Sequence, residues 1–149
     1  MRKAYLLCFL LLIFMLSGCS EKEKTVKFNV PKEISNIVIS GEGTEVYFSG
    51  DKDINKDKNI VLDDTEAVEI VVNALKQGTP PSTGAMTTEG PSLQINLIYK
   101  DNTQDTFDFW FRPEEKTGRF EDNDGRVFMF KKQDISKIET LLRKNAEKK

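Results

Sequence analysis

The spacing of apolar residues along the chain predicts two amphipathic helices. Between Asp63 and Gly78, apolar side chains recur at the i, i+3, i+4, i+7 spacing that places them on one helical face (Val68, Val71, Val72 and Leu75). Asp63 or Asp64 can cap the first amides of this helix, and Gly78 can end it. Near the C-terminus we expect Asp134 to cap a second helix with its own apolar stripe (Ile135, Ile138, Leu141 and Leu142).

Alternation of apolar and polar residues predicts the strands. The strongest signal is a hairpin formed by residues 92–100 and 106–111, with a turn at "DNTQD". A further strand at residues 126–130 follows the Asp124-Gly125 turn. Shorter alternating runs in "EISNIVIS" and "TEVYFSG" predict an opening pair of strands that meet near Gly41.

The order of these elements indicates the fold class. Strands joined by tight turns pair in an antiparallel manner, and each amphipathic helix needs a sheet face to cover. We therefore expect an α+β fold in which an antiparallel sheet of about five strands carries two amphipathic helices packed on one face. Residues 79–92 are rich in Gly, Pro, Ser and Thr and lack periodicity, so we expect them to form a long surface loop.

The start of the chain differs in character from the rest. Arg2 and Lys3 precede an uncharged apolar run from Ala4 to Leu16, which is shorter than the roughly 20 residues that a membrane-spanning helix needs. A basic start, a short apolar run and small residues at its end are typical of a signal peptide. The segment "LSGC", which ends at Cys19, resembles the lipobox of bacterial lipoproteins.

The lipobox resemblance implies that Cys19 receives a diacylglyceryl thioether, that the preceding peptide is removed, and that Cys19 becomes the new N-terminus. The alternative is an uncleaved membrane anchor with an incidental cysteine. A disulfide within the mature chain is excluded, because the only other cysteine, Cys8, lies in the segment that is removed. Two acyl chains hold a protein stably on a membrane. We therefore expect the protein on the extracytoplasmic face of the cell membrane, which it contacts through its lipid anchor.

The chain divides into three parts by this interpretation. We expect residues 1–18 to be the signal peptide, residues 19–32 a lipidated tether, and residues 33–149 a single α+β domain. The tether is mostly charged and polar, so it has little to bury. The remaining part is long enough for one hydrophobic core.

Charge and composition narrow the possible functions. The chain has 22 basic and 24 acidic side chains with both signs interspersed, so it offers no basic stripe to nucleic acid. It has no histidine, and its mature part has no free thiol once Cys19 is acylated. The commonest general base, cysteine nucleophiles and the usual zinc ligands are therefore missing. We expect neither an enzyme nor a cofactor.

Two short motifs suggest chemistry but lack essential parts. Residues 51–59 place oxygen-bearing side chains as in a calcium loop, but Lys56 and Leu62 stand where that loop needs Gly and a bidentate Glu. Residues 49–52 and 116–118 match the S-x-x-K and K-T-G motifs of penicillin-recognising enzymes, yet the chain has no S-D-N. We expect no metal site, and we interpret the second match as chance.

Trp110 is the residue that we single out for ligand binding. Strand alternation places it on the face opposite Phe107, Phe109 and Phe111, so its ring can be partly exposed. Exposed aromatic rings can anchor a partner. The alternative is that the ring packs against a loop or against the second face of the sheet.

The elements of the domain form a pattern: a strand pair, the helix "DDTEAVEIVVNALKQG", the hairpin "INLIYKDN…DFWF" and the closing helix "DISKIETLLRK". This pattern resembles the small YhfM-like lipoproteins of Gram-positive bacteria. The resemblance implies a fold and a location in the cell envelope, and it implies no activity. We expect a lipid-anchored, non-catalytic binding or interaction module whose envelope partner or ligand is unknown. The alternative is a small envelope hydrolase that uses a pair of carboxylates.

Overall fold

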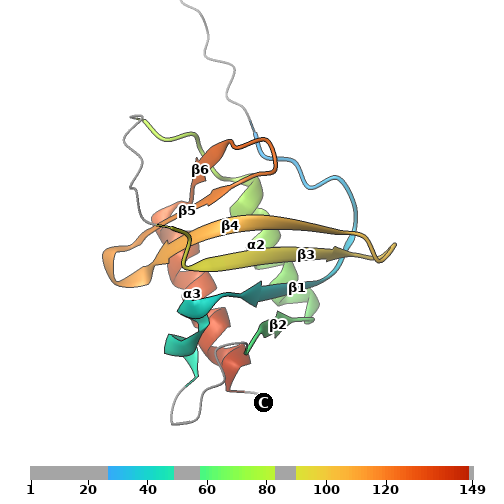
Figure 1. Cartoon of the computed structure of the whole chain (residues 1–149), viewed down its shortest axis with the longest axis horizontal. Helices are drawn as coiled ribbons and strands as arrows, with labels where there is room; N and C mark the ends of the chain where they lie inside the picture. The colour runs from blue at the N-terminus through green and yellow to red at the C-terminus, as the bar shows by residue number, and fades with distance from the viewer. Residues whose placement is uncertain (1–26, 49–57, 83–89, 148–149) are drawn as a thin grey trace, which may run out of the picture.

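The computed structural model describes residues 27–48, 58–82 and 90–147 (Figure 1). It contains an antiparallel sheet of six strands in the order β2-β1-β3-β4-β5-β6. The strands are β1 (Ile34–Ser40), β2 (Ile60–Leu62), β3 (Leu93–Tyr99), β4 (Gln104–Arg112), β5 (Thr117–Glu121) and β6 (Val127–Met129). The described helices are α2 (Thr65–Lys76), α3 (Lys132–Ala146) and the short 3-10 helices η1 (Glu42–Tyr47) and η2 (Pro113–Glu115). The expected α+β class is confirmed, with one strand more than expected.

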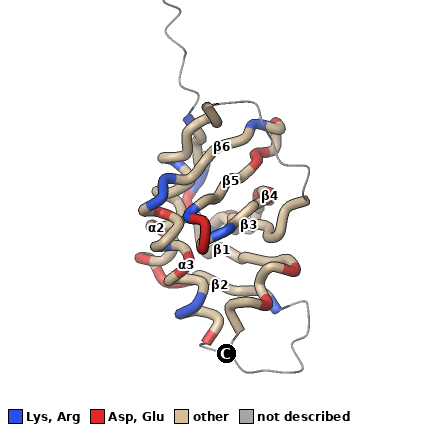
Figure 2. The backbone as a smooth tube through the Cα atoms, turned by 90° about the vertical axis from the view of Figure 1, so that its left-hand side faces the viewer, with Lys and Arg blue, Asp and Glu red and all other residues tan. Residues whose placement is uncertain are grey.

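The core lies between the sheet and the two α-helices, which cover the same face of the sheet (Figure 2). Every second residue of β3 and β4 points inward, so that Leu97 and Phe109 are completely buried. Each helix contributes one apolar stripe, with Leu75 of α2 and Leu142 of α3 at 0% exposure. The opposite face of the sheet is covered by no helix of the described part.

Helix α2 begins and ends as its sequence predicts. The side chain of Asp64 accepts hydrogen bonds from the backbone N–H groups of Glu66 (2.9 Å) and Ala67 (3.2 Å), which makes it the N-cap. The helix ends at Lys76. Gly78 follows at a point where a Cβ atom would lie 3.0 Å from the side chains of both Phe120 and Phe128, so a larger residue would displace core aromatic rings.

The expectation that Asp134 caps the second helix is wrong. Helix α3 begins at Lys132, and the backbone carbonyl of Lys131 accepts from the N–H groups of Asp134 and Ile135. Asp134 therefore lies inside the first turn, where it is 4% exposed. The apolar stripe that begins at Ile135 is confirmed as the buried face of α3.

The expected opening pair of strands is half correct. β1 forms, but Glu42–Tyr47 is the 3-10 helix η1, and Val46 is 68% exposed. Gly41 has a φ of 111°, and the Thr44 hydroxyl donates to the carbonyl oxygens of Gly41 (2.8 Å) and Lys58 (3.0 Å). These bonds hold the backbone in a tight turn where the alternation predicts a strand. The partner of β1 is instead β2, which pairs with Ile37–Ile39.

Strand β5 is absent from the expected elements, because one of its two buried positions is Gly118. It connects β4 to β6 and presents Phe120 to the core. The expected strand at residues 126–130 is confirmed as β6, and Gly125 has the positive φ (75°) that the turn requires. The free edge of β6 carries one bridge, in which Thr79 and Met129 exchange hydrogen bonds of 3.1 and 2.7 Å.

The expectation that residues up to 32 bury little is wrong for the described part of that segment. Phe28 is 7% exposed and packs edge-on against Phe107, Phe120 and Phe128. Val30 also packs against the core. Packing against the domain therefore begins before Glu33, although Lys27 and Lys32 around these residues are exposed.

Candidate functional site

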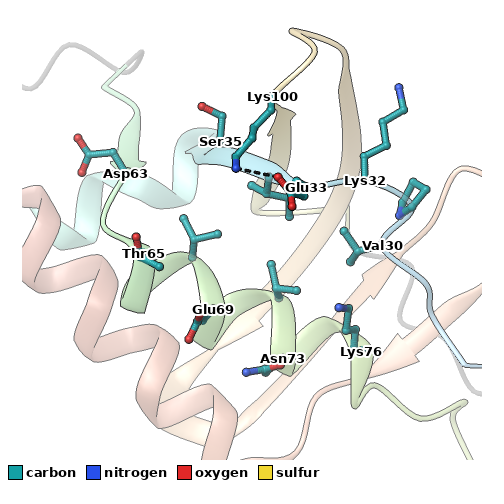
Figure 3. Close-up of a pocket in the computed structure, with 14 residues that line it drawn as sticks. Val30, Lys32, Glu33, Ser35, Asp63, Thr65, Glu69, Asn73, Lys76 and Lys100 are labelled. Carbon is teal, nitrogen blue, oxygen red and sulfur yellow. Dashed lines mark ion pairs between the residues drawn. The ribbon is translucent and has the colours of Figure 1, made fainter.

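A surface groove lies between helix α2 and the segment that leads into β1 (Figure 3). Its volume is about 910 Å³. Residues 30–35 form one wall and residues 65–76 form the other, while Asp63 and Lys100 lie at its rim. The two walls come from parts of the chain that are about thirty residues apart, so the sheet and the helix layer together create the groove.

The floor of the groove is apolar. Four of its lining side chains are partly buried and pack against the hydrophobic core: Val30, Ile34, Val68 and Val72. Two of these, Val68 and Val72, belong to the apolar stripe of α2, whose inner residues Val71 and Leu75 are buried. The apolar stripe of α2 therefore extends beyond the residues that are buried in the core, and its outer residues Val68 and Val72 line the groove.

Ion pairs fix the wall formed by residues 30–35. The Lys100 ammonium lies 2.7 Å from the Glu33 carboxylate, and this hydrogen bond and charge lower the pKa of Glu33. Lys32 lies 2.7 Å from the Asp101 carboxylate. Hydrogen bonds from Lys32 and from Thr103 lower the pKa of Asp101. Both pairs join this wall to the β3–β4 turn.

The charges along the other wall change sign from one end to the other. Asp63 and Glu69 lie toward the start of α2, and Lys76 lies at its end, beside Val30 (Figure 3). None of the three charged side chains forms an ion pair within residues 27–48, 58–82 and 90–147. A ligand in the groove would therefore meet acidic side chains toward one end and a basic side chain at the other.

The shifted pKa values of the described carboxyl groups can be compared with what acid–base catalysis needs. A carboxylic acid that donates a proton near neutral pH needs a raised pKa. The carboxyl groups with a resolved shift are Glu33, Asp101 and Asp122, and the pKa of each is lowered. An elongated groove with an apolar floor and charged rims is instead suited to an extended amphipathic ligand.

Trp110 lies on the opposite face of the sheet from the helices, as strand alternation predicts, and it is half-buried. The Arg119 guanidinium stacks over its ring at 4.3 Å from the centroid, and the two residues are directly paired between β4 and β5. Trp110 does not line the groove. Its proposed role in ligand binding therefore concerns a second surface and stays a prediction.

Several residues considered from sequence lie outside the described residues. These are Cys19 with the rest of the lipobox, the S-x-x-K segment 49–52, and residues 51–57 of the calcium-like loop. Of the K-T-G match, Lys116 ends η2 in the left-handed conformation and Gly118 lies in β5. Within the described ranges, no group of three or more carboxylate or cysteine side chains is arranged to hold a metal ion.

In the acidic turn before β6, the carboxylate of Asp122 has a structural role. Asp122 accepts hydrogen bonds from the backbone N–H groups of Asp124 (3.0 Å) and Arg126 (2.9 Å). Its other oxygen accepts from the Arg126 guanidinium at 2.7 and 2.8 Å. Burial raises the pKa of Asp122, but these hydrogen bonds lower it by more. The carboxylate therefore closes the turn.

The groove was not anticipated from the sequence, although one of its walls was. The apolar stripe of α2 is predicted from the sequence. Val68 and Val72 make this stripe wider than a single buried row, which indicates that one of its edges faces something other than the core. No local pattern connects this stripe with Val30 and Ile34, because their proximity depends on how the first strand joins the sheet.

Comparison with models of known protein families gives a match to the YhfM protein over residues 42–148. The matched range contains the α2 wall of the groove and does not contain residues 30–35. No curated protein and no solved structure gives a significant match. Among the helices of the described residues, none has the length and apolar character needed to cross a membrane.

Proposed function

The chain belongs to the YhfM family, and we propose that it is a lipid-anchored protein of the cell envelope that acts as a non-catalytic binding module. The observation that carries this proposal is the groove beside α2, with its apolar floor and the charged side chains of Asp63, Glu69 and Lys76, for which no ion pair is found among the described residues. A concave site with an apolar floor and a few charged groups around it is the usual form of a ligand site.

The lipobox supports the anchored location. Cys19 is nine residues before Phe28, which is packed into the core. An extended chain covers at most 3.3–3.6 Å per residue, so these nine residues reach roughly 30 Å at most. An acylated Cys19 would therefore hold the domain close to the membrane surface, where its partner would be another envelope component.

Of the carboxyl groups that line the groove, Glu33 has a lowered pKa because Lys100 binds it, so its carboxylate is poorly suited to donate a proton. A hydrolase with two carboxylates remains the alternative, and Asp63 and Glu69 are its candidates because both line the groove and neither forms an ion pair in the described part of the chain. Such an enzyme would need one of these two carboxyl groups to be protonated when the substrate binds.

The proposal can be tested in living cells with a photo-crosslinking residue at Asn73, which lines the groove and is exposed. We expect a discrete adduct in the membrane fraction, and we expect none from the same residue at Thr140 on the exposed side of α3. Equal labelling from both positions would contradict a binding groove. Hydrolysis of an envelope polymer by the purified protein, lost in Glu69→Gln, would favour the hydrolase.

A further inference from the structure

We propose that the occupant of the groove is an extended peptide segment that adds to the sheet beside β1, with a basic residue near its N-terminal end and a carboxylate at its C-terminal end. This inference rests on the proposed binding function, because it names the class of partner for the same groove. Three observations carry it: a gap in strand pairing, the dimensions of the groove and the order of its charges.

The gap lies at the start of β1. On one side, β1 pairs with β3 from Ile34 to Ser40, with an irregularity between Ile34 and Asn36 that leaves Ser35 without a partner in β3. On the other side, β2 pairs only with Ile37–Ile39. Within the described residues, no strand pairs with 34–36 on that side, because the chain leaves the sheet at Asp63 to begin α2. An unpaired strand edge is a template for another extended chain.

The space beside this edge has the size of a short strand. Helix α2 forms the far wall over twelve residues, or about 18 Å at 1.5 Å per residue. A strand rises about 3.3 Å per residue, so about five residues fit along that wall. Alternate side chains of such a strand would point toward the apolar floor at Ile34, Val68 and Val72.

The charges determine the direction of the occupant. A strand that continues the line of β2 runs antiparallel to β1, since β2 itself does. It would start at the end of the groove where Asp63 lies and finish at the end where Lys76 lies (Figure 3), and Glu69 also lines the groove. A basic residue at its start and a carboxylate at its end would each meet an unpaired opposite charge. A peptide in the reverse direction would place its charges beside like charges.

The test uses the acylated mature protein in non-ionic detergent and a dye-labelled peptide, Lys-Val-Thr-Val-Asp, with a free C-terminal carboxylate. Binding is measured by fluorescence anisotropy. We expect Glu69→Lys and Lys76→Glu each to weaken binding about fivefold, which is the upper range for an exposed ion pair. Glu66→Lys is the matched control, because it makes the same charge change on the same helix outside the groove, and it should leave affinity unchanged.

Two further peptides separate strand addition from simple charge attraction. The reversed peptide Asp-Val-Thr-Val-Lys should bind the wild type more weakly and should bind the Glu69→Lys, Lys76→Glu double variant better than the original peptide does. Methylation of alternate backbone nitrogens should weaken binding roughly tenfold or more, since it removes the hydrogen bonds of the ladder.

Several results would overturn the inference: no binding at millimolar peptide, equal binding of the methylated peptide, or equal sensitivity to Glu66→Lys. Adducts that join Asn73 of one copy to the groove of another copy would also overturn it, because the occupant would then be the protein itself. If any of these occurs while Asn73 still captures a distinct partner in cells, strand addition is wrong and the proposed binding function stands. Loss of that in-cell adduct would instead contradict the proposed function.

Discussion

The ring of Phe28 lies edge-on against the ring of Phe120, with centroids 5.0 Å apart and ring planes at 82°. Phe28 also contacts Phe107 and Phe128 at centroid distances of 5.2 and 5.8 Å. Edge-to-face contacts of this kind stabilise beyond the area that they bury. The segment that precedes β1 is thus held against β4, β5 and β6, and this contact positions the wall formed by residues 30–35, whose Val30 and Ile34 contribute to the apolar floor of the groove.

Replacement of Phe28 by alanine should therefore destabilise the domain. We expect the free energy of unfolding to fall by about 3 kcal/mol, the lower range for a buried phenylalanine, because a terminal segment can partly close the cavity. Urea denaturation of a chain that begins at Glu21 provides the measurement. The matched control is Lys27→Ala, an exposed neighbour. A change as small as that of the control would show that the Phe28 ring contributes nothing to the core.

The Asp122 turn should make the stability of the domain depend on pH in acid. The folded pKa of Asp122 is lowered below its ordinary value of about 3.9. Its contribution is therefore fully present above that pH and is lost as the pH falls toward the folded pKa. The free energy of unfolding should decrease below about pH 4 in the wild type, and this decrease should be smaller in Asp122→Asn.

At neutral pH, Asp122→Asn should lower the free energy of unfolding by about 2 kcal/mol, because the side chain is buried and its bonds to Arg126 and two backbone amides lose their charge assistance. Asp124→Asn is the control, since its side chain is 71% exposed and it loses only an exposed ion pair with Arg126 (2.8 Å), which should cost less than about 1 kcal/mol. Parallel pH profiles for wild type and Asp122→Asn would show that other carboxyl groups cause the acid sensitivity.

The sequence predicts those elements of the fold whose pattern of apolar and polar residues lies within one short segment of the chain. Helix α2 and the β3–β4 hairpin are predicted well, because their buried positions follow strict periods and their ends carry Asp64 and a polar turn. Residues 42–47 are predicted wrongly, because the alternation of apolar residues does not reveal the hydrogen bonds that Thr44 makes to Gly41 and to Lys58. Strand β5 is missed because Gly118 interrupts its apolar pattern.

The groove depends on contacts between residues that are far apart in the sequence, and the periodicity of a single segment does not predict such contacts. Phe28 stands among lysines and polar residues, so its segment has the composition of a solvated linker. The Phe28 ring is buried because it packs against aromatic rings that β4, β5 and β6 bring together in the folded domain. The unpaired edge at Ile34–Asn36 likewise exists because β2 is three residues long, which its sequence does not indicate.

The stacking of Arg119 on Trp110 can be followed by fluorescence, because Trp110 is the single tryptophan of the chain. Arg119→Ala should uncover part of the ring and shift its emission to longer wavelength, with a loss of about 0.5–1 kcal/mol of stability. Lys137→Ala, on the exposed side of α3, should leave the emission unchanged. An unchanged spectrum in Arg119→Ala would show that the guanidinium does not shield the ring.

The same fluorescence distinguishes the two candidate binding surfaces. Trp110 lies on the face of the sheet away from the helices, whereas the groove is beside α2. Saturation with the Lys-Val-Thr-Val-Asp peptide should therefore leave the Trp110 emission unchanged. A partner that alters this emission while Glu69→Lys has no effect on its binding would support the role predicted for Trp110 from the sequence.

The lipid anchor at Cys19 gives the last prediction. If the Cys19 thiol carries the two acyl chains, Cys19→Ala removes the thioether site and blocks the cleavage step that depends on it. Cells grown with a labelled fatty acid should label the wild-type protein and fail to label Cys19→Ala. Cys8→Ala is the matched control, because Cys8 lies in the expected signal peptide and should not affect labelling.

The folded domain should not depend on the anchor, since the described apolar core begins at Phe28. A chain that begins at Glu21 retains Phe28 and Val30, so it should be soluble and should unfold cooperatively without detergent. A chain that begins at Glu33 lacks both residues, and it should be less stable by at least the amount expected for Phe28→Ala, about 3 kcal/mol. Label retained by Cys19→Ala would refute the anchor, whereas equal stability of the two shortened chains would refute only the packing of the segment before β1.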